Sequence, residues 1–258
     1  MKQLLIIPDV NDREATLSLM EAYHVGVEYN DFFHPTILDD REKIKELLAQ
    51  YKQLVPVYST LHGAFFDVIP FSPDDRIKEI SRLRIEQSIE VAQSLGAKAV
   101  VFHTNYNPFL NTSAYINNWI KQNVEYWSKV LEEHTEISIY LENMFDSSPD
   151  ILEELSSELC KYNNYGVCLD YAHAAISKTE PTKWAKSLGK YVKHVHINDN
   201  DLISDLHLAW GDGKIDRKGF YNSYESYMGD ATVLIETQTT ANKLRSLQML
   251  EKEGFFTR

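Results

Sequence analysis

Eight short runs of apolar, often β-branched residues recur along the chain, separated by longer segments with apolar residues at helical spacing. Strands that alternate with helices in this way form parallel sheets. Eight such units within 258 residues fit a closed barrel, for which about 250 residues are typical. The predicted strands are Leu4–Ile7, Gly26–Tyr29, Val57–Leu61, Ala99–His103, Ser138–Glu142, Gly166–Asp170, Val192–Ile197 and Val233–Glu236.

An open, doubly wound sheet is the alternative α/β architecture, and it would favour a glycine-rich first strand–helix turn. Residues 8–12 (PDVND) contain no glycine, and no Pro-, Gly- or Ser-rich linker divides the chain. We therefore predict an α/β fold in which residues 1–258 form a single (β/α)8 barrel domain. Ser72-Pro73 and Ser148-Pro149 are predicted helix starts, and Gly96 is a predicted helix end.

Charge and composition narrow the classes of partner. The net charge of −12 argues against a broad phosphate-binding surface, because nucleic-acid-binding proteins normally carry a basic face. Cys160 and Cys168 are the only cysteines, and they lack the spacing of a thiolate zinc site. No apolar run approaches the roughly 20 residues needed to span a membrane. We expect a cytoplasmic protein without membrane contacts.

Residues that bind divalent metals cluster at the predicted carboxyl ends of the strands. In a (β/α)8 barrel these ends converge on one face, where barrel enzymes place their chemistry. His, Asp and Glu side chains together hold Zn²⁺ or Mn²⁺ without a thiolate. One such residue alone more often caps a strand or helix, but the joint occurrence favours a metal site. The candidate ligands are His62, His103, Glu142, Asp170, His173, His196, Asp205, His207 and Glu236.

Neighbouring residues receive different interpretations. His194 lies on the same face of its strand as His196 but one layer deeper, so it fills that layer or orients a ligand. Glu28 ends the second strand and either joins the rim or pairs with a basic neighbour. His24, His34 and His134 fall in predicted helices or loops and are not expected to bind metal.

Several of these residues lie in ordered motifs that resemble the xylose-isomerase-like TIM barrel superfamily. That superfamily includes sugar and sugar-phosphate isomerases and epimerases, and also endonuclease IV. The resemblance covers about residues 62–236. The motifs are HGAFF at 62–66, GAKAVVFH at 96–103, LEN at 141–143, LDYAH at 169–173, HIND at 196–199, DLH at 205–207, GDGKID at 211–216 and IET at 235–237.

The isomerase and epimerase branch implies one divalent ion held by Glu142, Asp170, His196 and Glu236. The resemblance also implies that Glu142 and Glu236 exchange a proton at the carbon α to a substrate carbonyl. Phe65 and Phe66 could wedge DNA, but we expect them to wall a pocket for a small substrate. Lys214, one of the few basic residues near a strand end, is also predicted to bind the substrate.

The endonuclease IV branch implies three zinc ions. The resemblance assigns one to His62, His103 and Glu142, a second to Glu142, Asp170, His196 and Glu236, and a third to His173, Asp205 and His207. The loop at residues 30–35 (NDFFHP), however, lacks the Arg and Gln expected of a DNA-penetrating loop, and residues 65–70 (FFDVIP) are apolar and acidic.

We therefore expect an isomerase or epimerase that acts on a small sugar or sugar phosphate and requires one to three zinc or manganese ions. A trinuclear zinc phosphodiesterase of the endonuclease IV type is the alternative, so binding to nucleic acid stays open. A non-catalytic, metal-bound sugar-binding protein is a third alternative. The oligomeric state is also open.

Overall fold

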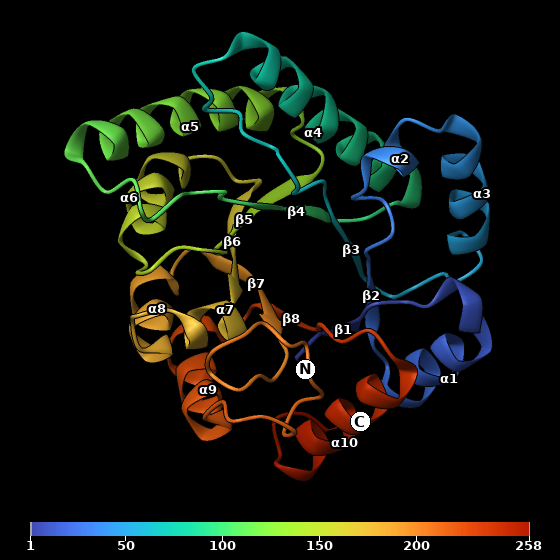
Figure 1. The fold of residues 1–258 in the computed structure, drawn as a ribbon. Coiled ribbons are helices and arrows are strands. Elements are labelled where there is room, and N and C mark those ends of the chain that lie inside the picture. Colours follow the sequence, from blue (N-terminus) through green and yellow to red (C-terminus); the bar gives the residue numbers. More distant parts are fainter. Residues whose placement is uncertain (1, 258) are drawn as a thin grey trace.

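A computed structural model describes residues 2–257 and contains a closed barrel of eight parallel strands (Figure 1). Each strand pairs with its neighbours in chain order, and β1 pairs with β8 to close the barrel. The predicted (β/α)8 barrel is thus confirmed; the first and last residues of the predicted domain lie outside the described residues. The strands are β1 (Leu4–Ile6), β2 (Gly26–Tyr29), β3 (Ser59–His62), β4 (Ala99–His103), β5 (Ser138–Glu142), β6 (Tyr165–Asp170), β7 (Val192–Ile197) and β8 (Thr232–Ile235).

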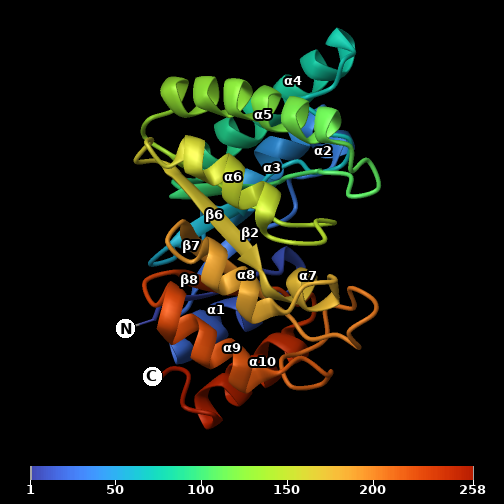
Figure 2. The same cartoon turned by 90° about the vertical axis from the view of Figure 1, so that its left-hand side faces the viewer.

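Helices form a ring around the barrel and cover its outer surface (Figures 1 and 2). The α-helices are α1 (Arg13–Tyr23), α2 (Pro35–Leu38), α3 (Arg41–Tyr51), α4 (Asp75–Leu95), α5 (Ser113–Glu133), α6 (Asp150–Leu159), α7 (Tyr171–Ile176), α8 (Pro181–Leu188), α9 (Arg217–Ser223) and α10 (Thr240–Lys252). A short turn, η1 (Val10–Asp12), precedes α1, and another, η2 (Tyr224–Met228), follows α9. None of the helices in residues 2–257 combines the length and apolarity needed to cross a membrane.

Alternating residues of each strand face either the helices or the barrel interior. Outward residues such as Val100 and Leu169 belong to the main apolar core between strands and helices. Ala99, Val101, Tyr140 and Cys168 form a separate, smaller cluster, as expected for the interior of the barrel. This part of the interior is filled by side chains, and the open space lies above it at the rim.

Glycine is required where Tyr140 fills the interior. A Cβ atom on Gly166 would lie 2.8 Å from Tyr140 Cδ1 and 2.6 Å from Lys193 Cγ. Those separations are shorter than real carbon–carbon contacts. The small residue at position 166 therefore makes room for the bulky side chain on the neighbouring strand.

Several predicted boundaries differ from the observed ones. Strand β3 begins at Ser59 because Val57 has no paired neighbour strand and is 76% exposed. The helix predicted to start at Ser72-Pro73 begins at Asp75, since the Asp74 carboxylate accepts a hydrogen bond from the Arg76 amide and caps it. Gly96 ends that helix as predicted, in a left-handed conformation with a φ of 69°.

Replacing the buried Leu169 with alanine should destabilise the barrel. Leu169 is completely buried between β6 and the helices, and removing its side chain leaves a cavity that costs about 2–5 kcal/mol. Urea unfolding followed by circular dichroism measures the loss. The matched control is Leu17→Ala on α1, where the side chain is 39% exposed and the cost should be much smaller. Equal losses in the two variants would contradict this packing.

Candidate metal centre

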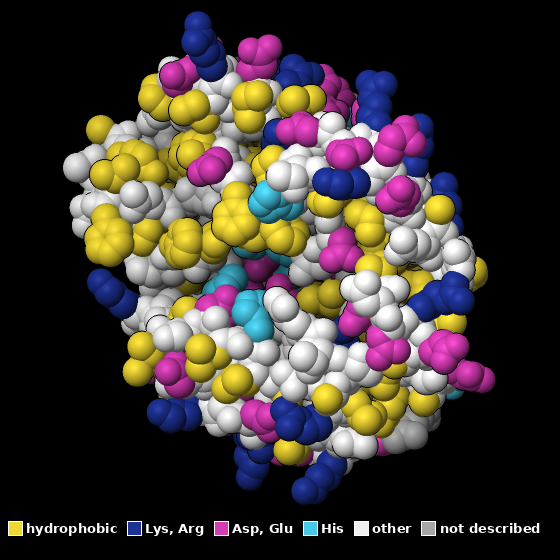
Figure 3. All heavy atoms as spheres, turned by 45° about the vertical axis from the view of Figure 1, so that its right-hand side comes forward, with side chains coloured by type: hydrophobic (Ala, Val, Ile, Leu, Met, Phe, Trp, Pro, Cys, Tyr) yellow, Lys and Arg dark blue, Asp and Glu magenta, His cyan; other side chains and the backbone are white. Residues whose placement is uncertain are grey.

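The strand register places the predicted ligands side by side at the carboxyl end of the barrel. His103 on β4 pairs with Glu142 on β5, and Asp170 on β6 pairs with His196 on β7. Each of these residues is the last or next-to-last of its strand. Figure 3 shows histidine and acidic side chains at the bottom of a hollow, with hydrophobic side chains gathered beside it.

The first group consists of His62, His103 and Glu142. The Oε2 atom of Glu142 lies 3.6 Å from His62 Nε2 and 3.4 Å from His103 Nε2. His62 Nδ1 lies 3.0 Å from the Gly63 carbonyl oxygen, so a proton on Nδ1 is donated there and the Nε2 lone pair faces Glu142. All three potential ligand atoms lie within 4.8 Å of one another.

The second group shares Glu142 through its other oxygen. Glu142 Oε1 and Glu236 Oε2 each lie 3.5 Å from His196 Nδ1. Ligand atoms of Glu142, Asp170 and His196 also lie within 4.8 Å of one another. The Asp170 backbone is held by Asn143, whose side-chain amide accepts a hydrogen bond from the Asp170 amide and donates one to its carbonyl oxygen.

The spacing and bonding of these atoms fit metal ligands. Glu142 Oε2, Asp170 Oδ2, His196 Nδ1 and Glu236 Oε2 are buried and have no hydrogen-bond partner among the described residues. The contacts of 3.4–3.6 Å are long for hydrogen bonds. Two ligands bound at about 2.0–2.2 Å to one tetrahedral ion lie about 3.3–3.6 Å apart. The donor set of imidazoles and carboxylates suits Zn²⁺ or Mn²⁺.

A third group lies at the edge of the hollow. His173 Nε2 and His207 Nε2 lie 3.3 Å and 2.9 Å from the same atom, Asp205 Oδ2. Their Nδ1 atoms lie 2.9 Å and 3.0 Å from the carbonyl oxygens of Asn143 and Glu236. Both imidazoles are therefore oriented by the backbone and turn their second nitrogen toward Asp205, but these three residues are not among the groups whose ligand atoms all lie within 4.8 Å of one another.

The buried histidines and carboxylates shift one another's pKa values. Burial would raise the pKa of Glu142, but the charges of His196 and His103 outweigh it and hold that pKa well below its usual range. Burial also opposes protonation of His207, yet the hydrogen bond to Asp205 raises its pKa to about 10. Asp170 behaves in the opposite way, since burial raises its pKa to about 7.

Glu28, which sequence reasoning left undecided, faces two of the histidines. It is completely buried inside the barrel, where its Oε1 lies 3.2 Å from His196 Nε2 and its Oε2 lies 3.1 Å from His194 Nε2. The Thr60 hydroxyl donates to Oε2 over 2.7 Å. With Nε2 of His196 facing Glu28, Nδ1 is the nitrogen left for a metal. The basic neighbour foreseen for Glu28 is thus a pair of histidines.

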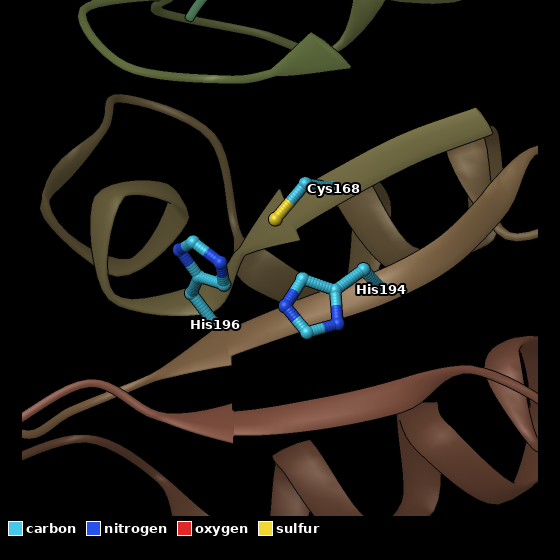
Figure 4. Close-up of side chains that lie close together, drawn as sticks. All are labelled: Cys168, His194 and His196. Carbon is cyan, nitrogen blue, oxygen red and sulfur yellow. The ribbon is translucent and has the colours of Figure 1, made fainter. Parts of the chain in front are cut away.

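His194 fills the deeper layer, as one of the two sequence interpretations proposed. Its Nδ1 lies 2.5 Å from the Thr232 hydroxyl, and Cys168 lies beside it in the strand register. Figure 4 shows Cys168, His194 and His196 close together, and one ligand atom of each lies within 4.8 Å of the others. Burial raises the pKa of the Cys168 thiol well above its usual value.

Asp199 organises the loop that carries Asp205 and His207. Its buried carboxylate accepts hydrogen bonds from the amides of Gly211 and Ile215 at 2.9 Å and 3.0 Å. A Cβ atom on Gly213 would overlap Asp199 Oδ1, so this position requires glycine. His207 itself has a φ of 47°, a left-handed conformation that is uncommon for residues other than glycine. Sequence reasoning missed Asp199, although it ends the strand-end motif HIND.

The predicted substrate-binding residues differ in position. The Phe65 ring lies 5.4 Å from His62 and 5.0 Å from His103, measured between ring centroids, and it stacks near Phe66 at 4.1 Å. These phenylalanines stand beside the first metal-ligand group. Lys214 is exposed, and its backbone amide bonds to Asn200 in the loop after β7. Its role in binding substrate stays a prediction.

The three histidines predicted not to bind metal have other surroundings. His24 ends α1 and His34 caps α2. His134 Nε2 lies 3.0 Å from Glu86 Oε2, and together with Glu133 these residues form a group at the outer surface of α4 and α5. None of the three joins the groups centred on Glu142.

Replacing Glu28 with glutamine should weaken metal binding while the fold is kept. Glutamine has nearly the same shape but lacks the charge that faces His196, and loss of such an orienting carboxylate typically lowers metal affinity about 10–100-fold. Competition with a chromophoric zinc chelator measures the change, and circular dichroism checks the fold. Glu46→Gln, at an exposed position of α3, is the matched control. Unaltered zinc affinity in a folded Glu28→Gln variant would contradict the orienting role.

Proteins with similar structures span nearly the whole chain. The TTHB071 protein from Thermus thermophilus, in a crystal soaked with ZnCl₂, has a TM-score of 0.75 and 23% identity, covering 98% of this chain and 99% of its own. A D-tagatose 3-epimerase-like protein has a TM-score of 0.76 and 23% identity, covering 98% and 96%. At this level of identity the likeness supports the fold.

Sequence relatives include two different kinds of protein. Uncharacterized protein MJ1311 of Methanocaldococcus jannaschii is 27% identical over 215 residues, which are 80% of this chain and 73% of the relative. A probable endonuclease 4 of Mycobacterium leprae is 23% identical over 222 residues, covering 81% of each chain. The profile of the family described as xylose isomerase-like TIM barrel matches residues 20–252. This chain therefore belongs to the xylose isomerase-like TIM barrel family.

Proposed function

We propose that the protein is a divalent-metal-dependent isomerase or epimerase that moves a proton at the carbon next to the carbonyl of a sugar. The main observation behind this proposal is the position of two buried carboxylates. Oxygen atoms of Glu142 and Glu236 each lie 3.5 Å from His196 Nδ1. The fold likeness to a D-tagatose 3-epimerase-like protein is consistent with this reaction class.

Glu142, Asp170, His196 and Glu236 would hold the catalytic ion. Bound there, the ion would act as a Lewis acid on the carbonyl and the adjacent hydroxyl of the sugar. Glu28 would keep His196 in the tautomer that presents Nδ1, and Asn143 would fix the backbone of Asp170. The protein thus supplies a preformed set of oxygen and nitrogen ligands around the reacting carbons.

Glu142 and Glu236 would perform the proton transfer from opposite sides of the sugar. One carboxylate removes the proton, and the electron pair of the broken C–H bond moves to the carbonyl oxygen, which gives an enediolate. The other carboxyl group then delivers a proton to carbon. Interactions with His196 lower the pKa of both residues against the effect of burial, so the residue that removes the proton is ionised. The residue that delivers a proton must first take one up from solvent or from a substrate hydroxyl group.

Replacing either carboxylate with glutamine should abolish turnover without unfolding the barrel. Loss of a general acid or base typically lowers kcat about 10²–10⁴-fold. Solvent-deuterium incorporation at the carbon next to the carbonyl, followed by NMR on a panel of ketoses and aldoses, measures the reaction. Glu46→Gln serves as the control variant. Near-normal deuterium exchange in the Glu142→Gln or Glu236→Gln variant would contradict the acid–base assignment.

A second candidate function is phosphodiester hydrolysis of the endonuclease IV type. The observation that favours it is the third group, because an isomerase with one ion has no need for His173, Asp205 and His207 as ligands. The probable endonuclease 4 of Mycobacterium leprae is also a sequence relative. The apolar Phe65–Phe66 pair and the net charge of −12 argue for a small neutral substrate instead.

Duplex DNA that carries one abasic site separates the two functions. We expect no incision by protein whose zinc or manganese content, measured by elemental analysis, accounts for the groups at the rim. Incision that disappears in His207→Ala would establish the phosphodiesterase function and overturn the isomerase proposal. Endonuclease IV from any characterised source provides the positive control for the DNA substrate.

A further inference from the structure

A cavity of about 690 Å³ adjoins the metal centre on the side of β4, β5 and β6. His173 of the third ligand group lines it, so the cavity is continuous with the rim. Its other walls come from the loops that follow β3, β4 and β5 and from the end of α7. Cavities of this size accommodate ligands much larger than one sugar ring. A single sugar bound at the metal centre would leave most of this space empty.

Aromatic side chains form the outer walls of the cavity. Phe109 in the loop after β4 is 90% exposed, and Phe145 in the loop after β5 is 63% exposed. Tyr106 lines the same cavity but is buried. Exposed aromatic side chains at a cavity mouth indicate a surface that a ligand covers. The faces of such rings carry negative potential and attract the polarised C–H groups of a sugar ring.

A buried carboxylate lies between these aromatic walls. Asp146 is 3% exposed and lines the cavity. Its Oδ2 atom accepts hydrogen bonds from the Thr104 hydroxyl at 2.8 Å and the Met144 amide at 3.0 Å. Its Oδ1 atom has no hydrogen-bond partner among residues 2–257. A buried acceptor of this kind gains when a ligand hydroxyl donates to it.

The charges of the lining disfavour an anionic ligand. Asp67 and Asp146 both line the cavity, and Lys178 is the one Lys or Arg among its described lining residues. A phosphate would meet acidic side chains on two of the walls, whereas a neutral polyol would meet acceptors for its hydroxyl groups. The combination of aromatic faces, an unsatisfied carboxylate oxygen and little positive charge matches an uncharged sugar ring.

We propose that this cavity is a binding subsite for a second sugar ring, so that the substrate is a keto-sugar carrying a further glycosyl unit. This inference rests on the proposed isomerase or epimerase function. The reacting sugar occupies the rim beside Glu142 and Glu236, and the glycosyl unit extends past His173 into the cavity. Phe145 and Phe109 are then specificity-determining residues that contact the second ring.

Fructose and fructose with a glucosyl unit on O4 or O6 provide the probes. Binding to the zinc-loaded protein is measured by saturation-transfer NMR titration, and turnover is measured separately by solvent-deuterium incorporation at C3. We expect at least one glucosylated fructose to bind tenfold or more tightly than fructose. Phe145→Ala should remove most of that difference and change the affinity for free fructose less than twofold. Phe109→Ala provides a second, independent variant.

The control variant is Tyr227→Ala, an exposed aromatic residue on η2 outside the cavity lining. Equal affinity for fructose and both glucosylated forms overturns the subsite, as does an equal loss for all three probes in Phe145→Ala. Phe145-dependent binding of a single-stranded oligonucleotide without saccharide binding also overturns it. Saccharide binding that depends on Phe145 but is not accompanied by deuterium exchange supports the subsite and counts against the proposed reaction. Failure of the subsite and failure of the proposed function therefore give different results.

Discussion

Several carboxylates are buried close together at the rim of the barrel, and their negative charge must be compensated. Glu28, Glu142, Asp170 and Glu236 are at most 7% exposed, and no Lys or Arg among residues 2–257 forms an ion pair with them. Buried negative charges are costly unless they are paired or bound to metal. Six histidines supply the pairing in the protein alone, and a bound cation would supply it more fully. This arrangement of buried charge is consistent with the proposed metal site.

The barrel makes this concentration of charge tolerable by keeping it at one end. Below the rim, Ala99, Val101, Tyr140 and Cys168 fill part of the interior, beside the hydrogen-bonded Glu28 and His194. Outside the strands, the helices cover a continuous apolar layer. Much of the stability therefore comes from the apolar layer between strands and helices, which leaves the rim free to carry polar groups that would be unfavourable elsewhere.

The sequence predicted the fold well because the relevant signals are local. Apolar runs, their spacing and the residue at the end of each strand suffice to place His103 beside Glu142 and Asp170 beside His196 once a closed parallel barrel is assumed. Glu28 was harder, because β2 and β7 are not neighbours and their side chains meet only across the barrel interior. The cavity at Asp146 was inaccessible to sequence reasoning, since three separate loops and a short helix build it. Side-chain packing between loops leaves no periodic pattern to read.

The position of Glu142 has a thermodynamic consequence. One oxygen faces His62 and His103, and the other faces His196, so a single carboxylate belongs to two ligand groups. An ion bound in one group would fix the orientation of the Glu142 carboxylate toward the other group. It would also neutralise part of the negative charge that attracts a second ion. The fixed orientation would favour binding of a second ion, whereas the loss of negative charge would oppose it. Ions bound in the two groups would therefore be energetically linked, and by reciprocity each would change the affinity for the other to the same extent.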